Sequence, residues 1–162
     1  MCRYFLILCL FVPMTSWAGA KLKVDEKFPE YNLKELGSEK KSTKAQTKGK
    51  VVIVDFWASW CEPCKKEIPA LNKIFKKYKA KGLLVVGINV DEAENTAKDF
   101  LKDHKVDFLR LYDVGKKLAD QCALATMPSS FVLDRTGTIK FIHAGYHDGD
   151  PAKFEAEIKM LF

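Results

Sequence analysis

Residues 51–71 read VVIVDFWASWCEPCKKEIPAL, and this stretch decides the fold. It opens with a valine-rich apolar run at 51–57, which is typical of a strand buried on both faces of a sheet. Apolar side chains then recur at helical spacing and predict a helix over 62–79. Cys61 and Cys64 therefore lie where the strand passes into the helix. Open α/β proteins place their chemistry at this carboxyl end of a strand.

Strands and helices alternate through the rest of the chain. The elements that we expect after the first helix are a strand at 83–90, a helix capped by Asp91 and ending near His104, a strand at 107–111, a helix at 114–122, a hairpin of 129–134 and 138–144, and a last helix begun by Asp150 as its cap. The lysine-rich segment 37–50 is predicted to be an exposed loop. This order predicts one α/β domain, with a mixed central sheet and helices on both faces.

The first twenty residues differ in kind from the rest. Arg3 precedes the ten-residue apolar run FLILCLFVPM, and Ala18 and Ala20 form an A-x-A pattern. These are the features of a secretory signal peptide, and the run is too short to span a bilayer as a stable anchor. We therefore expect cleavage near Ala20, export to the periplasm, and a single domain over 21–162. Retention of the uncleaved segment is the alternative.

Export changes the cysteine count. Cys2 and Cys9 leave with the signal peptide, so the mature chain keeps Cys61, Cys64 and Cys122. In an oxidising compartment, an odd number leaves one cysteine free or paired elsewhere. Cys122 lies where an apolar core residue would fit, and we expect it to be a buried free thiol.

The charge pattern argues against nucleic acid as a partner. The formal net charge is +6, but only three of the 27 basic residues are arginines, and the lysines are scattered among 21 acidic residues. An arginine-rich patch with interleaved aromatic residues would be expected at a nucleic-acid interface. We therefore expect a lysine-decorated surface with no nucleic-acid partner.

The position of the cysteine pair favours thiol chemistry. A cysteine at a helix N-terminus faces unpaired backbone N–H groups and the positive end of the helix dipole, which stabilise the thiolate of Cys61. The spacing lets Cys64 attack a mixed disulfide formed at Cys61, and Pro63 stiffens the loop between them. Glu62 opposes the thiolate, and the two lysines after Cys64 oppose Glu62 in turn. The sign of the net effect on the thiol stays open.

Asp55 interrupts an otherwise apolar strand six positions before Cys61. The alternation of the strand places it inward, beneath the start of the helix, where burial raises the pKa of a carboxyl. We predict that Asp55 accepts the proton of Cys64 when that thiol attacks a mixed disulfide. The alternatives are a hydrogen-bonded structural aspartate and one turned to solvent.

Two segments together resemble a known family. The opening stretch is similar to the active-site strand and helix of the thioredoxin superfamily, and ATMPSSFVLDRTGTI (125–139) is similar to its cis-proline loop and hairpin. The spacing from Cys61 to Pro128 is longer than in a plain thioredoxin, and the surplus is a helix and strand at about 91–111. This resembles the TlpA/ResA branch of exported thiol–disulfide oxidoreductases. The resemblance implies a thioredoxin-like fold with an inserted helix–strand between the Cys-x-x-Cys helix and the cis-proline loop.

The resemblance also implies roles for individual residues. Cys61 would be the attacking cysteine and Cys64 the resolving one, joined as a redox-active disulfide. Pro128 would be cis, and the backbone of Met127 would pair with a substrate segment beside the disulfide. Trp60 would pack near the site and contact substrate.

Glu92 matches a position where ResA-like proteins place a carboxylate near the cysteines, and the alternative is a solvated residue in the first turn of a helix. Asp55 departs from many members of that branch and agrees with thioredoxin itself. We therefore expect proton handling closer to that of thioredoxin. The resemblance gives Cys122 no role.

By the same resemblance, the protein is an enzyme without a cofactor or a bound metal. Its partners would be protein disulfides, for example in apocytochrome c during cytochrome c maturation, and a membrane electron donor. We expect a monomer. The Glu-Pro pair between the cysteines is like that of reducing ResA-type proteins and favours a reductant, although the same fold and spacing also serve dithiol oxidants.

A binding function is the alternative from a different class. Two thiolates and one of His104, His143 or His147 could hold copper or zinc. A single C-x2-C without a second ligand pair is weak for zinc, and related copper carriers have three residues between their cysteines. A peroxidase is less well supported, because the chain has no Thr-x-x-Cys peroxidatic motif.

Overall fold

The computed structural model describes residues 21–162, so the predicted signal peptide lies outside the described residues. The elements in chain order are β1 (Asn32–Glu35), β2 (Lys41–Thr43), η1 (Lys44–Thr47), β3 (Val51–Trp57), α1 (Cys64–Tyr78), η2 (Lys79–Lys81), β4 (Leu83–Asn89), α2 (Glu94–Asp103), β5 (Leu109–Tyr112), η3 (Val114–Lys116), α3 (Lys117–Cys122), β6 (Ser129–Leu133), β7 (Ile139–Ala144) and α4 (Asp150–Leu161). Among residues 21–162, none of these helices combines the length and the apolar character needed to cross a membrane.

Seven strands form one sheet in the order β2-β1-β5-β4-β3-β6-β7. β3 lies inside the sheet, parallel to β4 on one side and antiparallel to β6 on the other. The sheet is therefore mixed, as predicted. The inserted α2 and β5 fall between α1 and the loop before β6, also as predicted, and β5 extends the parallel part of the sheet beside β4.

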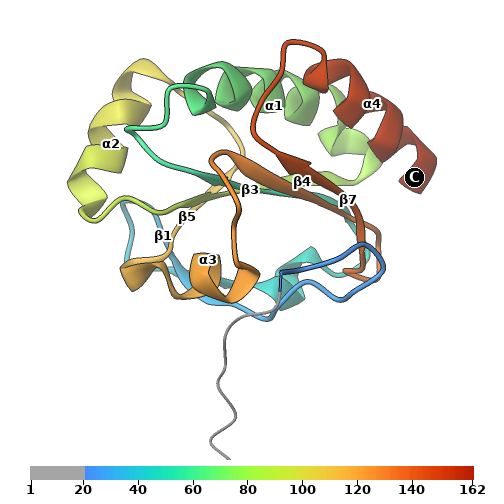
Figure 1. Cartoon of the computed structure of the whole chain (residues 1–162), viewed down its shortest axis with the longest axis horizontal. Coiled ribbons are helices and arrows are strands. Elements are labelled where there is room, and N and C mark those ends of the chain that lie inside the picture. Colours follow the sequence, from blue (N-terminus) through green and yellow to red (C-terminus); the bar gives the residue numbers. More distant parts are fainter. Residues whose placement is uncertain (1–20) are drawn as a thin grey trace, which may run out of the picture.

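All seven residues of β3 are buried, which explains why every one of them except Asp55 is apolar. Helices α1, α2 and α4 lie on one side of the sheet and α3 on the other (Figure 1). The Trp57 ring packs 5.2 Å from the Phe100 ring and fixes α2 against the end of β3. The carboxyl ends of β3 and β4, which carry the cysteine loop and the Asp91 loop, are thus held together by a rigid core.

Three local predictions were wrong. Segment 37–50 is not a plain loop, because 41–43 pairs with β1 and extends the sheet. Asp91 does not cap α2, whose N-cap is Ala93, because the Asp91 carboxylate accepts hydrogen bonds from Ser59 instead. Asp150 is the first residue of α4 rather than its cap, and its side chain accepts a hydrogen bond from the backbone N–H of His147.

Candidate active site

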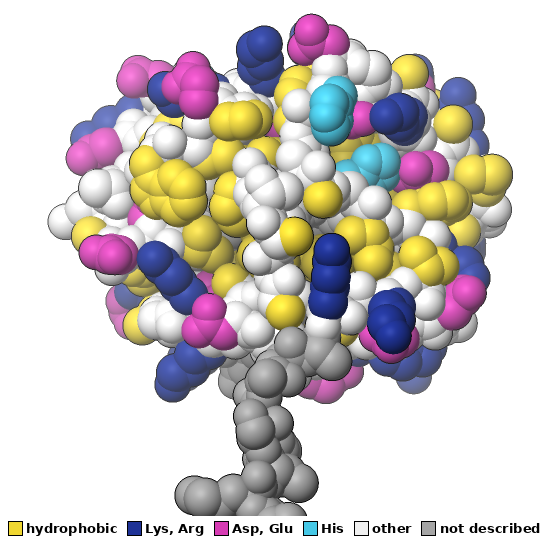
Figure 2. Space-filling view, viewed as in Figure 1, with side chains coloured by type: hydrophobic (Ala, Val, Ile, Leu, Met, Phe, Trp, Pro, Cys, Tyr) yellow, Lys and Arg dark blue, Asp and Glu magenta, His cyan; other side chains and the backbone are white. Residues whose placement is uncertain are grey.

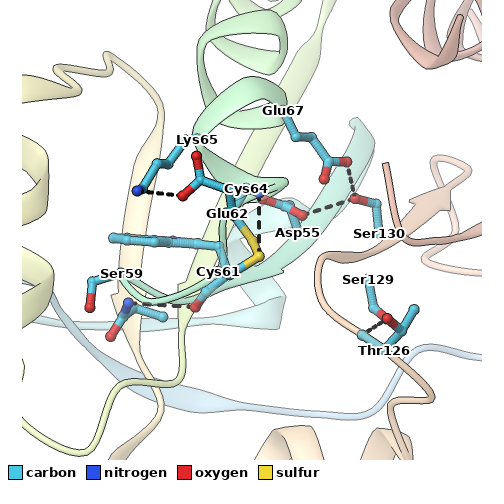
Figure 3. The surroundings of a disulfide bond; sticks show 12 residues. Asp55, Ser59, Cys61, Glu62, Cys64, Lys65, Glu67, Thr126, Ser129 and Ser130 are labelled. Carbon is cyan, nitrogen blue, oxygen red and sulfur yellow. Dashed lines mark hydrogen bonds and ion pairs between the residues drawn. A yellow bond between two sulfur atoms is a disulfide. The ribbon is translucent and has the colours of Figure 1, made fainter. Parts of the chain in front are cut away.

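The two cysteines of the Cys-x-x-Cys motif form a disulfide at the carboxyl end of β3, with their Cα atoms 5.3 Å apart (Figure 3). Cys61 lies in the loop and Cys64 is the first residue of α1. Cys61 is 3% exposed and Cys64 is fully buried. The backbone N–H of Cys64 donates to Cys61 Sγ at 3.3 Å, so a helix N–H faces the sulfur that would become the thiolate.

A buried aspartate at the end of β4 holds the loop that carries Cys61. Both carboxylate oxygens of Asp91 accept the backbone N–H of Ser59 at 3.1 Å, and one also accepts its hydroxyl at 3.0 Å. The Asn89 side chain donates to the same carboxylate at 2.9 Å. This network fixes the segment just before the disulfide.

Asp55 lies beneath α1, as predicted, and is completely buried. Ser130 on β6, directly opposite Asp55 in the sheet, brings its hydroxyl within 2.9 Å of Asp55 Oδ1. The same hydroxyl lies 2.9 Å from Oε1 of Glu67, which is buried on α1 one turn after Cys64. Figure 3 shows the two carboxyls converging on Ser130. The site therefore contains two buried acids beneath the first turns of the cysteine helix.

Burial changes the acidity of both groups. Loss of hydration raises the pKa of Asp55 to about 7. Loss of hydration, together with the nearby negative charge of Asp55, raises the pKa of Glu67 to about 9. Because the two carboxyls interact, protons leave them in steps that belong to the pair, at a pH above the range of ordinary carboxyls. Such a pair can release or take up a proton during thiol chemistry.

The charged side chains beside the motif partly neutralise each other. Lys65 Nζ lies 2.6 Å from the Glu62 carboxylate in an exposed ion pair (Figure 3). An exposed pair of this kind contributes little. Glu62 and Lys65 act on the Cys61 thiolate with opposite charges, so their effects largely cancel.

The loop before β6 forms the other wall of the site. The Met127–Pro128 bond is cis, as the family resemblance implies. The Ser129 hydroxyl donates to the Thr126 carbonyl at 2.6 Å, and the backbone N–H of Gly145 donates to the Pro128 carbonyl at 2.8 Å, which fixes the loop.

A cleft of about 350 Å³ opens beside this loop. Its lining residues are Trp60, Val90, Lys116, Ala119, Asp120, Ala123, Leu124 and Met127. Trp60 is 63% exposed, which is unusual for so large an apolar side chain. Hydrophobic side chains gather on the face that carries the loop between α3 and β6, with charged side chains toward its rim (Figure 2). The cleft thus offers an apolar surface next to the disulfide.

Glu92 does not lie among the buried groups of the site. Its side chain is 91% exposed, and its carboxylate is 3.9 Å from Lys116 Nζ. Sequence analysis instead missed Glu67. One signal was available: Glu67 precedes Leu71 by four residues and Ile74 by seven, so it falls on the apolar stripe of α1. A charged residue on such a stripe is a candidate buried acid.

The remaining cysteine and the histidines lie apart from the disulfide chemistry. Cys122 is a buried free thiol, as predicted, and burial raises its pKa to about 12. His143 bonds Glu157 at 2.7 Å, and His147 lies beside Asp150. Within 21–162, no three histidine, cysteine, aspartate or glutamate side chains come together as a potential metal site.

Comparison with known proteins agrees with this geometry. The profile of the Redoxin family matches residues 23–158. The chain belongs to the Redoxin family. It is 33% identical over 139 residues to the thiol–disulfide oxidoreductase ResA of Bacillus cereus, covering 83% of this chain and 80% of that one. It is also 33% identical over 151 residues to the thioredoxin-like protein YneN of Bacillus subtilis, covering 86% and 87% of the two chains.

Among solved structures, a thiol:disulfide interchange protein DsbE from Chlorobium tepidum matches with a TM-score of 0.83. It is 32% identical, and the match covers 87% of this chain and 99% of that chain. This Redoxin member therefore has the thioredoxin-like fold and is a thiol–disulfide oxidoreductase, with its Cys61–Cys64 disulfide at the expected place.

Proposed function

We propose that this protein is exported and reduces disulfide bonds in other proteins of the periplasm, cycling between the Cys61–Cys64 dithiol and disulfide. The signal-peptide pattern of the first twenty residues supports export. Disulfides in apocytochrome c are candidate substrates, in a pathway of cytochrome c maturation, and a membrane protein would return electrons to the cysteines.

The proposed direction of electron flow rests on one observation. The two titratable side chains joined by Ser130 beneath the cysteine helix, Asp55 and Glu67, are both acids. Negative charge near a thiol disfavours its thiolate. A strong oxidant owes its high potential to a stabilised reduced form. Buried carboxyls destabilise a nearby thiolate and with it the reduced form of the protein. The surroundings of Cys64 therefore favour the disulfide and make the dithiol a reductant.

The proposed reaction has two exchange steps. The Cys61 thiolate attacks one sulfur of a substrate disulfide, forms a mixed disulfide and releases the other substrate sulfur as a thiolate, which takes a proton. Asp55 then accepts the proton of the Cys64 thiol, and the Cys64 thiolate attacks Cys61 Sγ. The Cys61–Cys64 bond forms, the mixed bond breaks, and the second substrate sulfur leaves and is protonated.

The apolar cleft supports a polypeptide substrate. A segment lying along it would contact Trp60 and Met127 while its disulfide faces Cys61. The Met127 backbone, next to the cis-proline, would pair with the segment. Glu92 is the weakest of the proposed site residues, because its exposed carboxylate can influence the cysteines only through solvent.

A trapping experiment tests the function. In a Cys64→Ser, Cys122→Ser variant, Cys61 can form the mixed disulfide but nothing resolves it, so a model substrate disulfide should remain covalently attached. A Cys61→Ser, Cys122→Ser variant is the matched control and should trap nothing. Equal trapping by both variants, or none by either, would refute the proposal. Loss of the trapped species on adding dithiothreitol confirms that the link is a disulfide.

A further inference from the structure

The Ser130 hydroxyl joins two buried acids that come from different parts of the chain. It lies 2.9 Å from Asp55 on β3 and 2.9 Å from Glu67 on α1. All three side chains are almost completely buried. The outer oxygens, Asp55 Oδ2 and Glu67 Oε2, have no hydrogen-bond partner within the described part of the chain. Ser130 is thus the shared polar contact of the two acids.

Counting hydrogens fixes the protonation of this group. A serine hydroxyl has one hydrogen and can donate to only one carboxylate at a time. The second 2.9 Å contact is a hydrogen bond only if the other carboxyl carries a proton and donates it to Oγ. Two carboxylates would leave one contact repulsive in a site shielded from water. The geometry therefore requires at least one proton on the pair.

We propose that Ser130 is a proton relay that makes Asp55 and Glu67 act as one acid–base group during resolution of the mixed disulfide. The inference rests on the proposed function, in which Asp55 accepts the proton of Cys64. Before the attack, the proton of Asp55 passes to Ser130 Oγ while the hydroxyl hydrogen passes to the Glu67 carboxylate. Asp55 is then the carboxylate that accepts the proton of Cys64. The O–H bond of Asp55 breaks, one O–H bond forms and one breaks at Ser130 Oγ, and an O–H bond forms on Glu67, so no electrons are transferred in the relay. Ser130 acts through Asp55 and is a positioning residue.

The relay has several titratable neighbours. On the sheet, Asp55 faces Gly87 of β4, and Ser130 faces His143 of β7, which bonds Glu157 of α4. The other ionisable groups facing the pair are Cys64 on α1, Tyr146 in the loop before α4, and Asp150 at the start of α4, which is bonded to Lys153. The charge of Asp150 favours a proton on Glu67, because like charges repel.

Removal of the Ser130 hydroxyl should raise the pKa of Asp55. The hydrogen bond from this hydroxyl stabilises the ionised form of whichever carboxyl receives it, and so opposes the rise in pKa that burial causes in that carboxyl. Ser130→Ala should therefore leave Asp55 more protonated at pH 7 and remove part of the base that Cys64 needs. We expect resolution of a mixed disulfide to slow about three- to tenfold at pH 7, since one hydrogen bond moves an ionisation equilibrium by about that factor. The rate should recover as the pH rises.

The test combines carboxyl titration with kinetics. Carboxyl carbons of the oxidised protein, labelled with ¹³C in aspartate and glutamate, are followed by NMR against pH. In the unmodified protein, the Asp55 and Glu67 signals should move together through two shared steps. In Ser130→Ala they should titrate separately. Ser129→Ala is the matched control, since this neighbouring hydroxyl bonds Thr126 and neither acid, and it should leave both signals unchanged.

A second pair of variants keeps the shape of the strand. Ser130→Thr retains the hydroxyl and should preserve the coupled titration and the pH profile of resolution, whereas Ser130→Val has the same shape without the hydroxyl and should lose both. This comparison holds if Ser130→Ala fails to fold. Coupled titration in Ser130→Val, or an unshifted pH profile, would overturn the relay. If the titrations change as expected but the unmodified protein reduces no protein disulfide, the relay's network stands and the proposed function fails.

Discussion

Glu67 lies one helical turn after Cys64, and both side chains are buried on the inner face of α1. This relationship places an acid on the same helix as the resolving cysteine, in addition to Asp55 on the strand below. Glu67 shares the Ser130 hydroxyl with Asp55, so the acid on the helix and the acid on the strand belong to one network. Proton exchange at Cys64 can therefore draw on two carboxyls.

Asp55→Asn should stabilise the oxidised protein in a pH-dependent way. The pKa of Asp55 is raised, to about 7, so the folded state holds its proton over a range where the unfolded state has lost it. The stability that this proton contributes is complete below about pH 4 and is lost as the pH rises through 7. The variant should match the unmodified protein at pH 4 and exceed its free energy of unfolding by roughly 2–4 kcal/mol at pH 8.

Urea unfolding at a series of pH values measures this difference. Asp134→Asn is a control of opposite sign, because hydrogen bonds from the Thr136 and Thr138 turn lower the pKa of Asp134 against the opposing effect of its burial. Loss of the Asp134 carboxylate should lower the free energy of unfolding at neutral pH. This decrease should shrink as the pH falls below the usual pKa of an aspartate. A difference between Asp55→Asn and the unmodified protein that does not vary with pH would show that Asp55 is ionised, or solvated, throughout.

The three cysteines of residues 21–162 should differ sharply in reactivity after reduction. Cys61 is 3% exposed and its sulfur faces the backbone N–H of Cys64, which stabilises a thiolate, whereas Cys64 is fully buried and Cys122 is buried away from such a donor. Burial, and secondarily the charge of Asp113, raises the pKa of Cys122 to about 12, so very little thiolate is present at pH 7. Brief iodoacetamide treatment followed by peptide mass spectrometry should find Cys61 modified first and Cys122 unmodified until urea is added. Early labelling of Cys122 in the folded protein would contradict its burial.

The core of the fold is readable from sequence because it depends on local pattern. β3 is apolar at every position except Asp55, and α1 carries an apolar stripe, so the burial of both can be predicted from a few consecutive residues. The short polar strand β2 is different. Its residues have no strand pattern, and it exists because β1 offers it a partner. Pairing between short edge strands depends on contacts that no local window contains.

The site divides in the same way. The cysteines and the cis-proline loop follow from motifs, and the burial of Asp55 follows from strand alternation. Glu67 falls on the apolar stripe of α1, but its hydrogen-bond partner Ser130 lies 63 residues later in the chain, so its link to Asp55 has no local signal. Glu92 was placed near the cysteines by resemblance, but its side chain extends into solvent beside Lys116. Side-chain pairing across distant segments is the part that only the three-dimensional arrangement supplies.

Trp60→Ala should separate substrate binding from thiol chemistry. The exposed indole lines the cleft beside Cys61 and is not in the acid network. Its removal should lower kcat/KM for a protein disulfide about tenfold, the usual size of loss for one aromatic contact in an interface. The rate with a small disulfide such as hydroxyethyl disulfide should hardly change. Met160→Ala removes an equally exposed apolar side chain on α4 and should affect neither substrate. Equal losses with both substrates would place Trp60 in the chemistry rather than in binding.

The reduction potential of the Cys61–Cys64 couple decides the direction of electron flow. Because the buried Asp55 and Glu67 disfavour thiolate nearby, we expect a value below about −220 mV at pH 7, nearer to thioredoxin than to the periplasmic oxidants. Equilibration with glutathione or dithiothreitol buffers measures it. Glu67→Gln should raise the potential at alkaline pH, by roughly 30 mV for each tenfold gain in stability of the reduced form. A potential above about −150 mV in the unmodified protein would make it an oxidant or isomerase, and the proposal that it supplies reduced apocytochrome c would fall.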